Sequence, residues 1–287
     1  MQILQYIFLY PILYGISLLP FKLLYLLSDF SYFLGFRLFQ YRVKLVTNNM
    51  THSFPEKKDY EIKSLVRKFY HNFFDLIFES IKLLSISKNE IIARMKMGDM
   101  AVLEEYKNQG KSVILALAHY GNWEMGALAY TIGNYPSMVA VYKAQTNKFF
   151  DELMVKIRTR FGGEVVEMYE TMNKIRNTIH NQMAIALLAD QNPTGKNVYW
   201  YKFLDRETPV FTSVEVLAKR FNFPVVYLRV VRKNRGFYEM NCELLTDEPQ
   251  KTEKFAITQK YIHLVEQDIT NQPDNWLWTH NRWKRKK

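Results

Sequence analysis

The stretch from Val113 to Glu124 reads VILALAHYGNWE and divides into an apolar half and a polar half. The apolar half, VILALA, follows Gly110 and is typical of a buried strand in a parallel sheet. After the polar half, the segment from Met125 to Ile132 predicts the first turns of a helix. The polar residues therefore lie where a strand ends and a helix begins, which is the edge at which open α/β sheets bind ligands.

The polar half contains a histidine, His119, and a carboxylate, Glu124. We expect a turn that folds the helix start back over the strand end to bring the Glu124 carboxylate to one imidazole nitrogen. Such a carboxylate fixes the tautomer of the ring and leaves the other nitrogen as a general base. A histidine and a carboxylate at this spacing also occur in purely structural positions, so the pattern alone leaves both interpretations open.

Strands and helices alternate after this motif. Apolar runs predict strands at residues 138–142, 184–189 and 224–231, and helical periodicity predicts helices at 149–161, 171–181 and 208–221. Residues 237–245 alternate in polarity like an antiparallel edge strand. We therefore expect an α/β fold with a mostly parallel sheet flanked by helices. Asp190 follows one of these strands and should reach the same edge as His119, where it organises the site or an acceptor pocket; a surface turn explains it equally well.

The N-terminus is the most membrane-like part of the chain. Residues 1–21 carry no charged side chain, and residues 3–27 are mostly apolar over nearly the length that crosses a bilayer. Pro11, Gly15 and Pro20 interrupt the run, which favours a kinked or interfacial helical segment over a clean span. A buried helical hairpin is the alternative. We predict a membrane-associating segment at 1–45 and a main domain at 46–287, in which residues 60–84 form a long amphipathic helix.

Charge indicates an anionic partner. The net charge is +11 and the isoelectric point is near 9.4, which suits phosphorylated lipid, membrane headgroups, acyl carrier protein or nucleic acid. The tail carries Trp276, Trp278 and Trp283 among basic residues, a composition that suits a membrane interface or single-stranded nucleic acid. The apolar N-terminus favours lipid, so nucleic acid is not expected. A single cysteine, Cys242, excludes an internal disulfide, and no metal or cofactor is predicted.

Five blocks of sequence, in order, resemble the bacterial lipid A biosynthesis acyltransferases, which share an H-x4-(D/E) motif. The blocks cover residues 119–124, 141–143 with Asn147, 158–163, 189–192 and 273–284. Two departures stand out: YKFLD at 201–205 replaces a common Phe-Phe-Gly turn, and His280-Asn281-Arg282 replaces the commoner His-Arg-Arg. The first leaves the details of the acyl chain or acceptor open.

The resemblance implies an O-acyltransferase that moves a fatty acyl chain from acyl carrier protein, or from acyl-CoA, to a hydroxyl of an anionic glycolipid such as a lipid A precursor. It implies His119, Glu124 and Arg158 as catalytic residues, with Arg158 stabilising charge on the substrate. It also implies substrate binding by Asn122, Arg160, Asp190 and Gln191, and a location on the cytoplasmic face of the bacterial inner membrane.

Alternatives remain on the sequence alone. A basic residue at a helix end, as expected for Arg158 and Arg160, also serves simply to offset the helix dipole. The acceptor could equally be another membrane lipid, such as a glycerophospholipid, an aminolipid or a pigment precursor. A different class of function is a non-catalytic protein that binds membranes or nucleic acid, which the presence of both His119 and Glu124 disfavours.

Overall fold

A seven-stranded sheet forms the centre of the computed structural model, which describes residues 5–178, 181–193 and 198–287. The strand order is β1-β9-β8-β2-β5-β3-β4, and every neighbouring pair is parallel except β8 and β9. The strands are β1 (Met95–Met97), β2 (Val113–Leu117), β3 (Ser137–Tyr142), β4 (Glu164–Glu167), β5 (Met183–Leu188), β8 (Val225–Asn234) and β9 (Phe237–Thr246). A separate antiparallel pair consists of β6 (Tyr199–Phe203) and β7 (Arg206–Val210). The expected α/β class with a mostly parallel sheet is confirmed.

The central strand β2 explains why the sheet is covered on both faces. Its five residues are all buried, and successive side chains of a strand point to opposite faces. Ile114 and Ala116 belong to one apolar core, whereas Val113, Leu115 and Leu117 belong to another. A continuous apolar run is therefore what this position requires.

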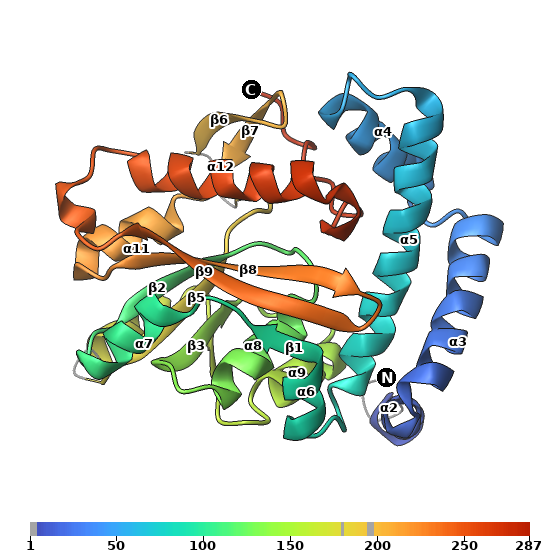
Figure 1. Cartoon of the computed structure of the whole chain (residues 1–287), viewed down its shortest axis with the longest axis horizontal. Helices are drawn as coiled ribbons and strands as arrows, with labels where there is room; N and C mark the ends of the chain where they lie inside the picture. Colours follow the sequence, from blue (N-terminus) through green and yellow to red (C-terminus); the bar gives the residue numbers. More distant parts are fainter. Residues whose placement is uncertain (1–4, 179–180, 194–197) are drawn as a thin grey trace.

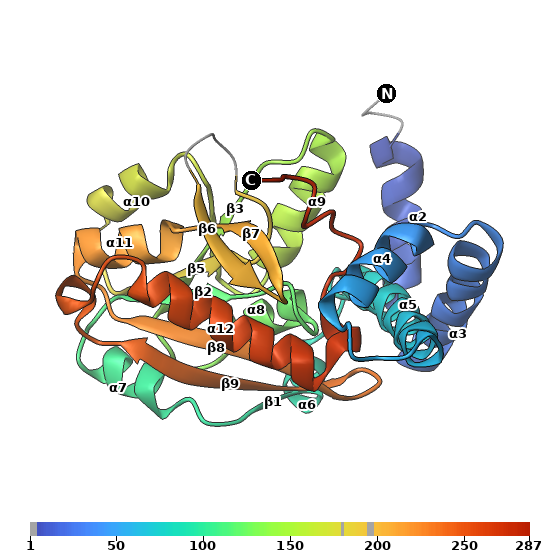
Figure 2. The same cartoon turned by 90° about the horizontal axis from the view of Figure 1, so that it is seen from above.

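Helices form the two outer layers. The first core is closed by α11 (Ser213–Phe221) and α12 (Ala256–Asn271), and the second by α6 (Lys88–Arg94), α7 (Ala101–Asn108), α8 (Trp123–Ile132) and α9 (Lys148–Arg158). Figures 1 and 2 show α12 lying along one side of the sheet, with α6 and α8 on the other. A short helix, α10 (Thr171–Asn177), connects β4 to β5.

The N-terminal helices stand together at one end of the sheet (Figure 1). They are α2 (Tyr10–Leu18), α3 (Phe21–Tyr32) and α4 (Val43–Ser53), with two π-helical turns at Gln5–Leu9 and Phe33–Leu38, and all three contact the long helix α5 (Asp59–Lys82). The amphipathic helix expected at 60–84 is thereby confirmed. In the described part of the chain, no helix combines the length and apolar character needed to cross a bilayer.

Large apolar side chains remain exposed on this N-terminal part. They occur in the π-helical turn Gln5–Leu9, on α2, on α3 and in the segment that follows, and they are Tyr6, Ile7, Phe8, Ile12, Tyr14, Leu18, Leu23, Leu26, Phe30, Phe33, Leu38, Phe39 and Tyr41. We call this set the apolar face. Complete burial as a helical hairpin, the alternative considered from the sequence, therefore does not describe these residues. Where exposed apolar side chains form a large patch, the patch usually marks contact with a membrane or a partner.

Two expectations about secondary structure were wrong. The strand at 237–245 is antiparallel to β8, as expected, but it is not the outermost strand along its whole length, because the three-residue strand β1 pairs with residues 238–240 on its outer side. The helix expected from Thr208 begins only at Ser213, since residues 206–210 form β7 against β6. Pro209 lies in that strand, where a two-stranded ribbon has an outer edge that needs no N–H donor.

Candidate active site

His119 and Asp190 meet at the carboxyl edge of the parallel sheet. In the register of β2 and β5, Leu117 lies opposite Leu188. His119 and Asp190 each follow two residues later, so they leave the sheet side by side. The imidazole Nδ1 lies 2.7 Å from one oxygen of Asp190, and the other oxygen accepts a hydrogen bond from the backbone N–H of His119 at 3.1 Å. Asp190 therefore holds both the ring and the backbone of this histidine.

The Asp190 carboxylate is fully enclosed. Burial alone would raise its pKa, but the charge of His119 and the hydrogen bonds from His119 and Trp276 outweigh burial and lower the pKa below its usual value. Trp276 Nε1 donates the third of these bonds at 2.8 Å. An ionised Asp190 favours the tautomer in which Nδ1 carries the proton, which leaves Nε2 of His119 as the basic nitrogen.

A cavity of about 690 Å³ opens beside this pair. Its volume lies in the range of pockets that hold small molecules or cofactors. His119, Trp123, Glu124, Arg158 and Gln191 line it together with many apolar side chains, among them Met138, Ala140, Met172, Leu187, Phe211 and Leu217. A cavity with many apolar side chains and with His119 in its wall can hold a hydrocarbon chain next to a general base.

Glu124 does not orient His119, contrary to expectation. Its two oxygens accept hydrogen bonds from Arg158, from Nε at 2.9 Å and from Nη2 at 2.5 Å, and Trp123 Nε1 donates a third at 3.2 Å. The first turn of α8 directs Glu124 toward Arg158, the last residue of α9. The carboxylate that contacts the His119 imidazole is instead Asp190, which follows the neighbouring strand β5. Burial alone would lower the pKa of Arg158, but Glu124 reverses this and raises it, so the pair is ionic.

Asn122 and Arg160 face away from the cavity, so the structure does not support their expected role in substrate binding. The Asn122 side chain is buried, accepts the N–H of Met125 as the cap of α8, and donates to Glu79. The Arg160 guanidinium donates to the carbonyls of Leu83 and Ile86, just after α5. Both side chains brace the scaffold around the site.

Sequence reasoning did not assign roles to three further residues that line the cavity. Asn192 donates through Nδ2 to Nε2 of His280 at 3.1 Å, and both side chains line the cavity, as does the exposed Lys284. Burial lowers the pKa of His280 to about 4, so its ring is neutral at neutral pH. The sequence block at 273–284 contains both His280 and Lys284, and it is the signal that could have identified them.

The tryptophans of that block are core residues, which corrects the expectation of an aromatic membrane contact. Trp276 and Trp278 are fully buried, and Trp283 packs on Phe203 and Trp276. Backbone bonds tie this segment to the motif: Gly121 donates to Asn275 at 3.0 Å, and Leu277 donates to His119 at 3.2 Å. The tail therefore fixes the turn that carries the histidine.

The described ranges contain no group of three His, Cys, Asp or Glu side chains placed to hold a metal ion. The histidine–aspartate pair, the ionic Glu124–Arg158 pair and the apolar cavity together define an α/β enzyme whose site suits proton transfer beside a hydrocarbon substrate. The chain belongs to the bacterial lipid A biosynthesis acyltransferase family, whose model matches residues 1–285. It is thus an acyltransferase. A comparison with curated proteins gave no match.

Proposed function

We propose that this protein transfers a fatty acyl chain from the thioester of acyl carrier protein to a hydroxyl of a lipid A precursor. The observation that carries the proposal is His119, which lines the cavity and is held from behind by the buried Asp190, taken together with the family. The cavity accepts the acyl chain, and the acceptor hydroxyl approaches Nε2 of His119.

The reaction needs one proton carrier. His119 takes the proton of the acceptor hydroxyl as the oxygen attacks the thioester carbonyl, and Asp190 stabilises the imidazolium that forms. The tetrahedral intermediate then collapses: the carbon–sulfur bond breaks, the ester remains on the acceptor, and His119 returns the proton to the leaving thiolate. No covalent bond between the acyl chain and the protein is required.

Arg158 supplies positive charge to the same cavity. Its Nε and Nη2 bind Glu124, and the planar guanidinium keeps Nη1 in a fixed direction for a further contact. We propose that Nη1 stabilises the oxyanion of the intermediate or an anionic group of the substrate. Glu124 then has the role of holding this donor in place.

We expect Arg158→Ala to lower turnover by about 10²–10³-fold, because removal of one preorganised oxyanion donor has an effect of this size. Arg158→Lys restores only part of the rate, since lysine lacks the planar fork that binds Glu124. Acyl-transfer rates and thermal unfolding should be measured on the same preparations. Arg160→Ala is the control, and its rate stays much closer to wild type. Full activity of Arg158→Lys would return Arg158 to a structural role.

The positive charge of the protein supports acyl carrier protein as the donor. The chain carries a net charge of +11, and exposed Lys143 and Lys284 line the cavity beside Arg158. An acidic carrier protein is attracted to such a surface, and the attraction raises the rate of encounter. The test compares the same acyl chain on acyl carrier protein and on CoA, with a purified lipid A precursor as acceptor. A higher kcat/KM for the carrier protein that falls with added salt supports the proposal, whereas a preference for CoA rejects this donor.

The apolar face supports attachment to the membrane that holds the acceptor. We place the enzyme on the cytoplasmic face of the bacterial inner membrane, because Lys22, Arg37, Arg42 and Lys44 flank the apolar residues and cytoplasmic segments are rich in such charges. In this arrangement the helices α2 and α3 lie in the interface and bring the cavity to the lipid.

We expect the protein to stay in the membrane pellet through a high-salt wash and to be released by detergent. Burial of apolar side chains in lipid resists salt, whereas binding through basic residues alone weakens as ions screen it. Fractions should be followed by immunoblotting. A variant with Leu23, Leu26 and Phe30 changed to serine should be released more readily, and complete release of the wild type by salt would rule out this anchor.

A further inference from the structure

A carboxylate with no assigned role lies behind the active site. Glu79, on α5, is 1% exposed and contributes nothing to the cavity beside His119. Its oxygens accept hydrogen bonds from Tyr25 on α3 at 2.9 Å, from Asn122 at 2.7 Å and from Tyr238 on β9 at 2.6 Å. Burial raises the pKa of Glu79, while the bonds from Tyr238 and Asn122 oppose the rise. A carboxylate is rarely buried this completely unless partners satisfy it, as these three donors do.

Asn122 connects Glu79 to the part of the chain that lines the catalytic cavity. Its Nδ2 donates to Glu79, and its Oδ1 accepts the N–H of Met125 at 2.9 Å, so one amide joins α5 to the first turn of α8. Trp123 and Glu124 follow immediately, and both line the cavity. The rotation of the Asn122 side chain is thus set from two sides at once.

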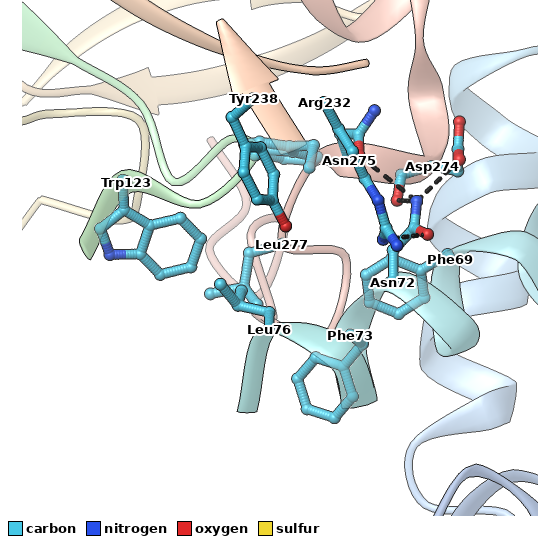
Figure 3. A pocket seen from close by; sticks show the side chains of 12 residues that line it. Phe69, Asn72, Phe73, Leu76, Trp123, Arg232, Tyr238, Asp274, Asn275 and Leu277 are labelled. Atoms are coloured by element: carbon cyan, nitrogen blue, oxygen red, sulfur yellow. Dashed lines mark hydrogen bonds between the residues drawn. The ribbon is translucent and has the colours of Figure 1, made fainter. Parts of the chain in front are cut away.

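The turn before Asn122 has little freedom to move. Gly121 adopts a positive φ of 61°, and a Cβ there would approach the carbonyl oxygen of Val230 to 2.3 Å. Figure 3 shows the far side of this turn, where Tyr238 descends from β9 beside Trp123 with its hydroxyl directed toward α5. The crevice drawn there has a volume of about 20 Å³, room for about one water molecule, and Trp123 lines both this crevice and the catalytic cavity.

We infer that Glu79 is a positioning residue for acyl transfer: its carboxylate holds Asn122, and Asn122 sets the start of α8 that carries Trp123 and Glu124 into the cavity. Glu124 in turn holds Arg158. A substitution at Glu79 should therefore displace the Arg158 guanidinium, which faces the substrate. Trp123 also packs edge-on against His119, with ring centroids 5.1 Å apart. The inference rests on the acyl transfer proposed above and adds a residue that does not touch the substrate.

The first test is Glu79→Gln in the full-length protein in detergent, assayed with a fatty acyl thioester of acyl carrier protein and a lipid A precursor. We expect kcat per folded enzyme to fall about 10-fold to 100-fold, because small displacements of catalytic groups have effects of this size. The KM for the donor changes little, since Glu79 does not line the cavity. Tyr25→Phe is the matched control: it removes a bond from the carboxylate oxygen that Asn122 does not use, and it should lower stability but not kcat.

The second test exchanges the donor and the acceptor of the hydrogen bond between Asn122 and Glu79. In Glu79→Gln combined with Asn122→Asp, the glutamine amide donates to the aspartate, and aspartate caps a helix as well as asparagine does. We expect this double variant to fold and to recover much of the lost kcat even if Glu79→Gln alone is too unstable to assay. A double variant no better than the single one, or a Glu79→Gln enzyme with wild-type kcat, would overturn the inference.

A readout without substrate separates this inference from the proposed function. Hydrogen exchange of the peptide containing the Met125 and Gly126 amides should be faster in Glu79→Gln and should return toward wild type in the double variant. If the wild type transfers no acyl chain but this pattern holds, the proposed function fails and the positioning role stands. Unchanged exchange in Glu79→Gln contradicts the positioning role whatever the substrate is.

Discussion

His119→Ala is expected to remove nearly all acyl transfer while the protein remains folded. The imidazole is the basic group at the end of β2, and general-base catalysis by such a group contributes about 10²–10⁴-fold to the rate. The side chain is 20% exposed and lies in the wall of the cavity, so its truncation leaves the two apolar cores of the sheet intact. Initial rates should be compared with thermal unfolding on the same preparation.

Binding provides the control for this variant. Because the apolar side chains that line the cavity remain in place, His119→Ala should retain the acyl donor with an affinity near that of the wild type. If the variant binds the acyl donor but does not turn over, the substitution has affected the chemical step and not donor binding. Turnover within a few-fold of wild type would exclude His119 as the base.

Asp190→Asn is expected to have the second large effect. The substitution keeps the size of the side chain but removes the negative charge that fixes the Nδ1–H tautomer and stabilises the imidazolium. Loss of the partner of a catalytic histidine lowers rates by about 10⁴-fold in serine proteases, and we expect a loss of about 10²–10⁴-fold here. Steady-state kinetics on folded protein measure it.

The double variant with His119→Ala distinguishes Asp190 from Glu124. Residues that act as a unit have strongly non-additive effects. Asp190→Asn should therefore cost little further activity once His119 is absent, whereas Glu124→Gln, which disturbs Arg158, should still reduce the residual rate. The reverse result would mean that Glu124 is the partner of the imidazole, as the spacing in the sequence first indicated.

The edge at which the site lies could be predicted from the sequence, because it depends on periodicity alone. The apolar run of β2, followed by His119, and the run of β5, followed by Asp190, each end where a parallel sheet presents its side chains to a ligand. The pairing of these two side chains needed the register of β2 against β5, which a single sequence does not contain.

Other residues were misjudged for similar reasons. Arg160 lies two residues after Arg158, yet the Arg158 guanidinium lines the cavity and that of Arg160 binds carbonyls after α5. Arg158 is the last residue of α9, whereas Arg160 lies in the turn that follows, where the chain changes direction. The tail looked suited to a membrane interface, but Trp276 and Trp278 are buried against the core. Composition alone cannot distinguish an aromatic cluster that packs inward from one that faces lipid.

The apolar N-terminus shows what composition can predict. Its residues were expected to contact lipid because they are apolar, and many of them do remain exposed on α2 and α3. The interruptions at Pro11 and Pro20 were read as breaks in a spanning helix; Pro11 lies in the first turn of α2, and Pro20 precedes α3. Proline is tolerated at such positions because the first turn of a helix needs no N–H donor there.

Mass spectrometry of cellular lipids tests the central claim most directly. Lipid A should be compared from cells that contain the wild-type protein, cells that lack it, and cells that carry His119→Ala. We predict that lipid A from the last two loses one acyl chain, and that the mass difference identifies the chain. Unchanged lipid A in cells without the protein, with an acyl chain missing from a different lipid, would contradict the proposed acceptor.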